Sequence, residues 1–284
     1  GLISPLPTPY EWVDGKAGVS IPRDDRGLNY ADGAFETMSC SSGEIACQSL
    51  HSDRLSLALE ALRFPHPEAI AQRVFDDVCR CVASVGHSGT ARRTVTRGSG
   101  PRGYAPPDSA SPRHILTLFP LSGQTPDRQS CGIAQIRWAH QPQLAGLKLL
   151  ARTEQVLAAR EAATQQWDDM LMLDAQDHVI STSRGNIFAF FGNQCVTPDL
   201  SRCGIAGTRR QLLIETVLPQ LDYVVNEQSI TLAALRQADA VLISNTVRGV
   251  VSMSRIEDQH YPESAFPGRI QDALRQQVAS WVGR

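Results

Sequence analysis

Residues 26–37 read Arg26-Gly27-Leu28-Asn29-Tyr30-Ala31-Asp32-Gly33-Ala34-Phe35-Glu36-Thr37. The end of this stretch runs into 34–38, which predicts a strand, and 44–50 predicts a partner strand across a turn at Ser42-Gly43. Further elements are expected on both sides. They are a pair of short strands within 11–21, helices at 53–62 and 68–85, and strands at 92–97 and 114–119. This mixture predicts an α+β first half.

The second half of the chain is richer in predicted strands. The expected elements are strands at 132–138, 170–173, 179–182, 187–191, 194–197, 223–225 and 240–244, and helices at 153–164, from about 208, and at 268–282. Residues 121–130, rich in Ser, Gly, Pro and Asp, predict a linker. We therefore expect a disordered extension at 1–10, a small α+β domain at 11–120 and a larger strand-rich domain at 131–284.

Charge and composition exclude several classes of protein. The 284 residues carry a formal net charge of -2 with both signs dispersed, which is not the pattern of a nucleic-acid-binding protein. No apolar run approaches the roughly 20 residues that cross a bilayer, and the N-terminus does not read as a secretory signal. The seven cysteines form no Cys-x-x-Cys pair, so neither a disulfide framework nor a metal site is expected. These features predict a cytoplasmic protein that acts on a small molecule, with neither a membrane nor a nucleic acid as partner.

Lysine is scarce in this chain. Lys16 and Lys148 are its two lysines, against 25 arginines. Amine chemistry would need one of the two, because an arginine keeps its charge whereas a desolvated lysine can lose its proton and form a Schiff base with a carbonyl. Lys16 follows the turn pair Asp14-Gly15, which predicts an exposed position. Lys148 lies among leucines, where desolvation would lower its pKa, although a surface lysine lying along an apolar patch fits the same residues.

Four separated motifs resemble those of one enzyme family. Residues 26–37 are similar to the R-G-x-x-Y-x-D-G-x-F-E-T opening of fold-type IV pyridoxal phosphate enzymes, 51–55 to their H-x-x-R-L helix start, and 207–211 to their G-[I/V]-x-R turn. The loop 97–104, followed by 144–148, resembles one branch, the 4-amino-4-deoxychorismate lyases of folate synthesis. The resemblance implies a two-domain α+β enzyme with pyridoxal 5'-phosphate as cofactor, and a homodimer.

The resemblance also implies which residues hold the cofactor. Gly204–Gly207 precede a predicted helix, whose N-terminal N–H groups and positive dipole end suit a phosphate. An ordinary glycine-rich loop before a capped helix would read the same way. Carried over from the family, the phosphate ligands would be Arg54, the backbone of Thr208 and Arg209, and the hydroxyl of Thr246, with Asn245 as a further cofactor-binding residue.

For the reaction, the resemblance implies that Lys148 bonds covalently to the cofactor and then removes the C4 proton of the substrate. Enolpyruvate would leave from C3, giving 4-aminobenzoate and pyruvate. Thr37 is the candidate for proton transfer to the leaving group, although it fits equally well as a β-branched strand residue. Arg97, Arg102 and Tyr104 are the candidates for binding a substrate with two carboxylates.

One position departs from the family pattern. Where E-G-T-x-x-N-x-F is usual, residues 181–188 begin with Ser181 in place of the glutamate that faces the pyridine nitrogen. A hydroxyl cannot keep that nitrogen protonated as a carboxylate does, and this loss should harm transamination more than elimination. A D-amino-acid or branched-chain aminotransferase and a homologue without turnover are the alternatives. A related amino-cyclohexadiene is also open as the substrate.

Overall fold

The structure is a computed structural model that describes residues 10–121, 126–279 and 281. They divide into two compact units, unit 1 with residues 10–121, 147–151, 279 and 281, and unit 2 with residues 126–146 and 152–278. The predicted extension at 1–10 lies outside the described residues except for Tyr10, and so do 122–125 of the predicted linker. A strand already begins at Arg128, inside that linker, and 147–151 belong to unit 1 although we expected them in the second domain.

Unit 1 is built on a six-stranded antiparallel sheet with the order β2-β1-β6-β5-β3-β4. Its centre is the long pair β3 and β5, in register from Gly33 opposite Thr96 to Cys40 opposite Gly89. The turn at Ser42-Gly43 is present, but the strand predicted at 44–50 covers only Glu44–Ile45, because a helix already begins at Gln48. The strands are β1 (Tyr10–Val13), β2 (Lys16–Ala17), β3 (Gly33–Ser41), β4 (Glu44–Ile45), β5 (Gly89–Thr96) and β6 (Arg113–Phe119).

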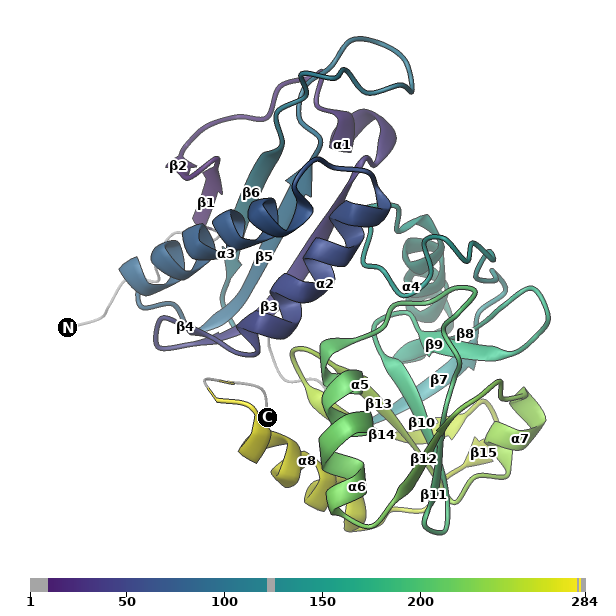
Figure 1. The fold of residues 1–284 in the computed structure, drawn as a ribbon. Coiled ribbons are helices and arrows are strands. Elements are labelled where there is room, and N and C mark those ends of the chain that lie inside the picture. The colour runs from purple at the N-terminus through teal and green to yellow at the C-terminus, as the bar shows by residue number, and fades with distance from the viewer. Residues whose placement is uncertain (1–9, 122–125, 280, 282–284) are drawn as a thin grey trace. The chain divides into compact units, whose positions relative to one another are not determined.

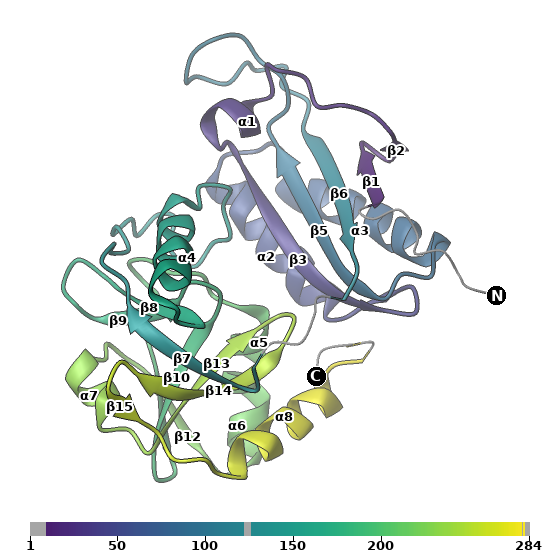
Figure 2. The ribbon, with the colours of Figure 1, turned by 180° about the vertical axis from the view of Figure 1, so that it is seen from behind.

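Two helices cover one face of this sheet, as the opposite views in Figures 1 and 2 show. They are α2 (Gln48–Ala61) and α3 (Pro67–Ser84), and the short α1 (Arg26–Tyr30) precedes β3. The apolar positions of α3 recur at helical spacing, so Ile70, Val74 and Val78 are buried on its sheet-facing side. With Leu55 and Leu59 of α2 they form the core of unit 1.

The two glycines of the 26–37 motif lie where the chain is too closely packed for a side chain. A Cβ on Gly33 would lie 2.2 Å from the carbonyl oxygen of Val95, and a Cβ on Gly27 would lie 2.3 Å from a methyl carbon of Thr96. Side chains at Gly27 and Gly33 would therefore displace β5.

The lysine segment, residues 147–151, runs beside β3. It is joined to β3 by a bridge between Ala34 and Leu149.

Unit 2 contains a mixed sheet with the order β12-β11-β10-β13-β14-β7-β8-β9. Because β9 also pairs with β10, through Ser181 and Asn186, the six strands from β10 to β9 close on themselves. Leu171 and Leu173 face one core cluster, and Met170 and Met172 face another, so β8 is buried on both sides. The strands are β7 (Arg128–Ile133), β8 (Asp169–Leu173), β9 (Val179–Thr182), β10 (Asn186–Phe191), β11 (Gln194–Thr197), β12 (Val224–Glu227), β13 (Ala240–Asn245), β14 (Gly249–Ile256) and β15 (Gln259–His260).

Helices complete unit 2. In α4, Ala158 and Ala162 are buried in the cluster that also holds Met170 and Met172, so this helix packs on β8 through small side chains. A continuous helical run follows the glycine turn at 204–207. The helices are α4 (Thr153–Gln165), α5 (Thr208–Leu212), the π-helical η1 (Leu213–Val217), α6 (Leu218–Gln220), α7 (Leu232–Arg236) and α8 (Phe266–Gln277). Both units combine helices with strands, which confirms the predicted two-domain α+β class.

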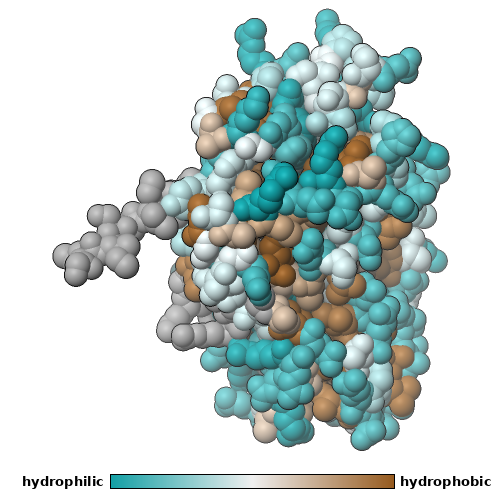
Figure 3. All heavy atoms as spheres, turned by 60° about the vertical axis from the view of Figure 1, so that its left-hand side comes forward, coloured by the Kyte–Doolittle hydropathy of each residue, from teal (hydrophilic) through white to brown (hydrophobic). Residues whose placement is uncertain are grey.

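The surface is mixed in character. On the face drawn in Figure 3, hydrophobic side chains gather in patches among hydrophilic ones. Several large apolar side chains are exposed, among them Leu28, Leu57, Val156 and Leu157. No helix within the described part of the chain has the length and apolar character needed to cross a membrane.

Candidate cofactor and substrate site

Lys148 lies in unit 1, half-buried on the lysine segment. Its carbonyl oxygen accepts a hydrogen bond of 3.1 Å from the backbone N–H of Phe35, which fixes the segment against β3. Its Nζ lies 4.8 Å from the centroid of the Phe35 ring. The Phe35 ring therefore helps to fix the position of the Lys148 amine, the type of group that forms a Schiff base. Lys16, as predicted, is exposed.

The sheet surface beside Lys148 carries a second cation. Thr37 is two residues beyond Phe35 on β3, so the two side chains share a face, and Arg92 of β5 is in register with Thr37. The guanidinium carbon of Arg92 lies 4.0 Å from the Phe35 ring centroid, and burial lowers the pKa of Arg92. The face that holds Thr37 and Lys148 is therefore cationic, which suits an anionic ligand. We did not predict Arg92 as a site residue from the sequence. The signal available for it was the alternation of side chains along the predicted strand at 92–97, which assigns Arg92 to one face of the sheet.

Arg54 is a buried residue of α2 that pairs with the motif glutamate. Its Nε and Nη2 donate to the Glu36 carboxylate at 2.9 and 2.6 Å, and His51 Nδ1 lies 2.6 Å from the same carboxylate. Burial alone would raise the pKa of Glu36, but the charge of Arg54 and the hydrogen bond with His51 lower it to about 2. Glu36 therefore orients the predicted phosphate ligand Arg54, a task that we did not assign to it from the sequence.

The loop at 97–104 divides into a buried and an exposed part. Arg97 is buried, and its guanidinium donates to both oxygens of Asp32, at 2.8 and 3.0 Å, and to the carbonyl oxygen of Leu62. The N–H groups of Arg97 are thus used in hydrogen bonds within unit 1, so we no longer propose Arg97 as a substrate ligand. Arg102 and Tyr104 are exposed, and their substrate role stays a prediction.

The 26–37 motif holds the exposed part of this loop. Arg26 donates to the carbonyl oxygens of Gly103, at 2.8 Å, and of Tyr104. Tyr30 accepts a hydrogen bond of 2.9 Å from the N–H of Gly103 at its hydroxyl oxygen, and its ring meets the Tyr104 ring edge-on at 5.6 Å. The motif arginine and tyrosine therefore set the position of Tyr104.

In unit 2 the glycine turn opens directly into the helical run from Thr208. Gly207 is extended, and its N–H donates to Asn186 Oδ1, while Asn186 Nδ2 donates to the carbonyl oxygen of Ile205 at 2.7 Å. A Cβ on Gly207 would lie 2.3 Å from Asn186 Oδ1. A residue without a side chain is required here, which keeps the backbone accessible at the start of the helix.

Three of the predicted phosphate ligands come together in unit 2. Arg209 is buried, and its Nη1 donates to the Thr208 hydroxyl at 3.1 Å while its Nη2 donates to the carbonyl oxygen of Thr246 at 3.3 Å. Asn245 forms the adjoining turn, because its Oδ1 accepts from the N–H groups of Val247 and Arg248. Hydroxyls, a guanidinium and a helix N-terminus are the groups that bind phosphate in proteins, so these residues fit the phosphate of the cofactor.

Ser181 is buried where β9 closes the strand ring onto β10. Its Oγ accepts a hydrogen bond of 2.9 Å from the indole Nε1 of Trp138. At the position where the family usually has a glutamate, this chain thus has a hydrogen bond between two uncharged side chains, those of Trp138 and Ser181. Trp138 was not among the predicted residues, and its distance in sequence from Ser181 gave no signal for the contact.

Comparison with known proteins agrees with this geometry. Residues 33–256 match the family model described as amino-transferase class IV, and the chain belongs to that family. The family depends on pyridoxal phosphate, so this is a pyridoxal phosphate enzyme.

Among its relatives, the chain is 31% identical over 249 residues to an aminodeoxychorismate lyase of Vibrio harveyi, covering 86% of this chain and 90% of the relative. It is 26% identical to a D-alanine aminotransferase of Listeria innocua, covering 84% and 83%. The solved 4-amino-4-deoxychorismate lyase of Pseudomonas aeruginosa superposes with a TM-score of 0.86 at 34% identity, covering 94% of this chain and 98% of that one. The branched-chain aminotransferase of Escherichia coli, at a TM-score of 0.83 and 19% identity over 94% and 93%, shares the fold.

Proposed function

We propose that this enzyme is an aminodeoxychorismate lyase, which splits 4-amino-4-deoxychorismate into 4-aminobenzoate and pyruvate for folate synthesis. The observation that carries the proposal is Ser181, a hydroxyl bonded to Trp138 where an aminotransferase of this fold needs a carboxylate. The higher identity to the lyases than to the aminotransferases, over nearly the whole chain, supports the same choice.

When bound, the cofactor supplies an electron sink next to the carbon that carries the substrate's amino group. Lys148 would hold the cofactor, and its amine would take the proton from C4 of the bound substrate. The C3–O bond then breaks, and the ring gains aromaticity as enolpyruvate leaves. Thr37, on the same sheet face as Phe35, delivers a proton to the leaving group, which becomes pyruvate.

Binding and orientation fall to charged and hydroxyl groups. Arg209 and the two residues that it contacts, Thr208 and Thr246, are the proposed phosphate ligands, and the family resemblance adds Arg54, which Glu36 fixes. The cationic face at Arg92 and the exposed Arg102 suit the two carboxylates of the substrate. The alternative, an aminotransferase, rests on the 26% identity to D-alanine aminotransferase over 84% of the chain.

Purified enzyme given 4-amino-4-deoxychorismate tests the proposal. We expect pyruvate and 4-aminobenzoate in equal amounts, without any added keto acid. Turnover that requires both an amino acid and a keto acid would instead identify an aminotransferase. Turnover of a related amino-cyclohexadiene alone would keep the lyase chemistry and change the substrate.

The predicted homodimer and the cytoplasmic location stay predictions. For the dimer, the exposed apolar side chains of α4, Val156 and Leu157, are the surface that an interface would cover. Light scattering of the purified protein measures its mass directly.

A further inference from the structure

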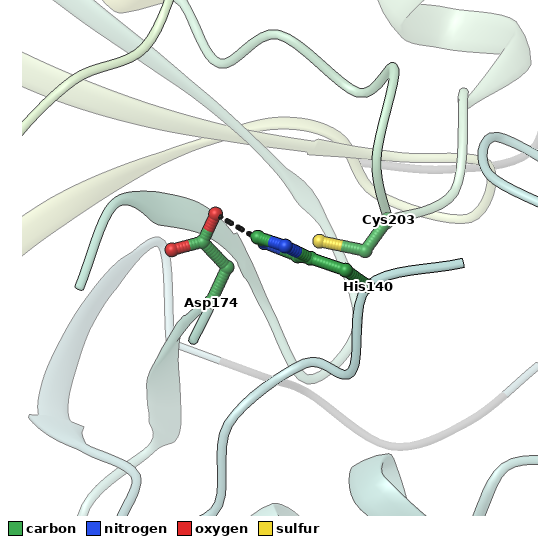
Figure 4. Close-up of side chains that lie close together, drawn as sticks. All are labelled: His140, Asp174 and Cys203. Atoms are coloured by element: carbon green, nitrogen blue, oxygen red, sulfur yellow. Dashed lines mark hydrogen bonds and ion pairs between the residues drawn. The ribbon is translucent and has the colours of Figure 1, made fainter. Parts of the chain in front are cut away.

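Three side chains of types that bind metals meet in unit 2, as Figure 4 shows. His140 lies in the stretch before the lysine segment, Asp174 follows β8, and Cys203 precedes the glycine turn at 204–207. His140 Nε2 is 2.8 Å from Asp174 Oδ2. One nitrogen, oxygen or sulfur atom from each residue lies within 4.8 Å of the others.

The backbone holds this cluster in place. Asp174 Oδ1 accepts hydrogen bonds from the N–H groups of Gln176 and His178, both at 2.9 Å, so Oδ2 is the oxygen that faces His140. The N–H of Gln141 donates to the carbonyl oxygen of Arg202 at 2.8 Å, which joins the segments that carry His140 and Cys203. The three side chains are therefore arranged before any ligand arrives.

Charge around the cluster is mainly negative. Burial, followed by the charges of Asp174 and Glu154, raises the pKa of Cys203 to about 12. Although burial opposes it, hydrogen bonds from His140 and two backbone N–H groups lower the pKa of Asp174, which stays ionised. A buried thiol of this kind is a poor nucleophile, so a Cys-His-Asp catalytic triad does not fit. The same negative charges favour a cation.

We propose that His140, Asp174 and Cys203 bind a zinc ion. Imidazole nitrogen, carboxylate oxygen and thiolate sulfur are all zinc ligands, at about 2.0 to 2.3 Å, and three protein ligands with water in the fourth position make a common zinc site. Tetrahedral zinc needs its ligand atoms about 3.3 to 3.8 Å apart, so the hydrogen-bonded pair of His140 and Asp174, at 2.8 Å, must open by about 0.5 to 1 Å, and separations of up to 4.8 Å must close by about 1 Å. The zinc replaces the thiol proton, which is released to solvent.

A small pocket and a further histidine adjoin Asp174. A small pocket lined by Asp174, His178 and Arg202, among others, lies beside the cluster, and His140 is partly exposed. His178 Nδ1 lies 3.8 Å from Asp174 Oδ2, and water would take the fourth position on the ion. A bound ion would link the segment before Lys148 to the loop before the glycine turn, and thereby stiffen both.

Zinc binding to the chelator-treated holoenzyme, measured by competition with a chromophoric chelator, tests this proposal. We expect wild-type protein to bind one equivalent, with an affinity that rises with pH because zinc displaces the thiol proton of Cys203. Second-sphere partners are already worth about 10- to 100-fold in metal affinity, so His140→Gln and Cys203→Ala should each lose at least that much. Magnesium, which avoids sulfur, should not compete.

Matched controls are His260→Gln, at an exposed histidine on β15, and Cys195→Ala, at a buried cysteine on β11. Both should bind zinc as wild type does. Zinc should also raise the unfolding temperature of wild-type protein and of the controls, but not of the cluster variants. Because His140 is partly exposed, its variant should fold even if Cys203→Ala does not. Unchanged zinc affinity in folded His140→Gln, or no zinc binding by wild type, would overturn the proposal, and neither result depends on lyase activity.

Discussion

At the scale of single residues, the proposed chemistry depends on Lys148. Lys148→Ala should abolish both the visible absorbance of the bound cofactor and turnover, because the other lysine, Lys16, is exposed on β2. Lys16→Ala is the matched control and should keep both. Absorbance spectra and pyruvate release measure the two properties, and wild-type activity in Lys148→Ala would refute the mechanism.

We propose that Ser181 favours elimination over transamination. Ser181→Glu should raise transamination more than it raises lyase turnover, because a carboxylate facing the pyridine nitrogen keeps it protonated. Ser181→Gln has the same size without the charge, so it separates the charge effect from the loss of the bond with Trp138. Both activities are followed in each variant. An equal fall of both in Ser181→Glu would contradict the placement of Ser181 at the nitrogen.

Residues predicted from a family motif differ from residues found through contacts in how far apart along the chain the relevant residues lie. Lys148 and Arg209 belong to local motifs, whose spacing is visible in the sequence. The pairing of Arg97 with Asp32, and of Trp138 with Ser181, joins residues that are distant in the chain. The sequence also gave no signal for the proposed zinc site. The absence of Cys-x-x-Cys argues only against zinc ligands that lie close together in sequence, whereas folding brings His140, Asp174 and Cys203 together from separate segments.

At the scale of elements, the glycine turn before α5 gives a prediction. Gly207→Ala would place a Cβ 2.3 Å from Asn186 Oδ1, an atom already held by the Gly207 N–H. We expect the turn to shift and cofactor affinity to fall, at a cost of about 1 to 3 kcal/mol for the clash. Titrating apo-protein with pyridoxal phosphate measures it.

The control for this turn is Gly268→Ala. A Cβ there meets nothing within 4 Å, and the residue lies in α8, where alanine favours the helix. Cofactor affinity and stability should therefore hold in Gly268→Ala. If Gly207→Ala also binds the cofactor as wild type does, the turn does not contribute to the phosphate site.

Elements with strong local patterns were predictable, and those defined by pairing were not. The hairpin at Ser42-Gly43 and the amphipathic α3 follow from turn chemistry and helical spacing. Strand β7 begins at Arg128 because it pairs with β14 and β8, although its first residues have linker composition. The lysine segment joins unit 1 through the bridge at Leu149, a contact that no local pattern encodes.

At the scale of the whole molecule, the buried pair of Glu36 and Arg54 links stability to pH. The pKa of Glu36 is about 2 in the folded state against about 4.5 unfolded. A folded-state pKa below the unfolded value stabilises the fold above the unfolded pKa, and this contribution is lost as pH falls from about 5 to about 2. At about 1.4 kcal/mol per unit, it amounts to about 3 kcal/mol at neutral pH. Arg54→Ala would strand the carboxylate and so destabilise the fold besides weakening cofactor binding.

Glu36→Gln isolates this effect, because it keeps the size of the side chain and removes the charge. The variant should unfold at lower denaturant concentration than wild type at neutral pH, and the difference should shrink as the pH falls below about 5, where the wild-type carboxylate begins to lose its advantage. Glu44→Gln, at an exposed glutamate on β4, is the control and should show little difference at either pH. Denaturant unfolding of the three proteins across this range gives the free energies. A gap between Glu36→Gln and wild type that stays constant with pH would mean that the variant loses packing and hydrogen bonds alone, and that the depressed pKa of Glu36 does not contribute to stability.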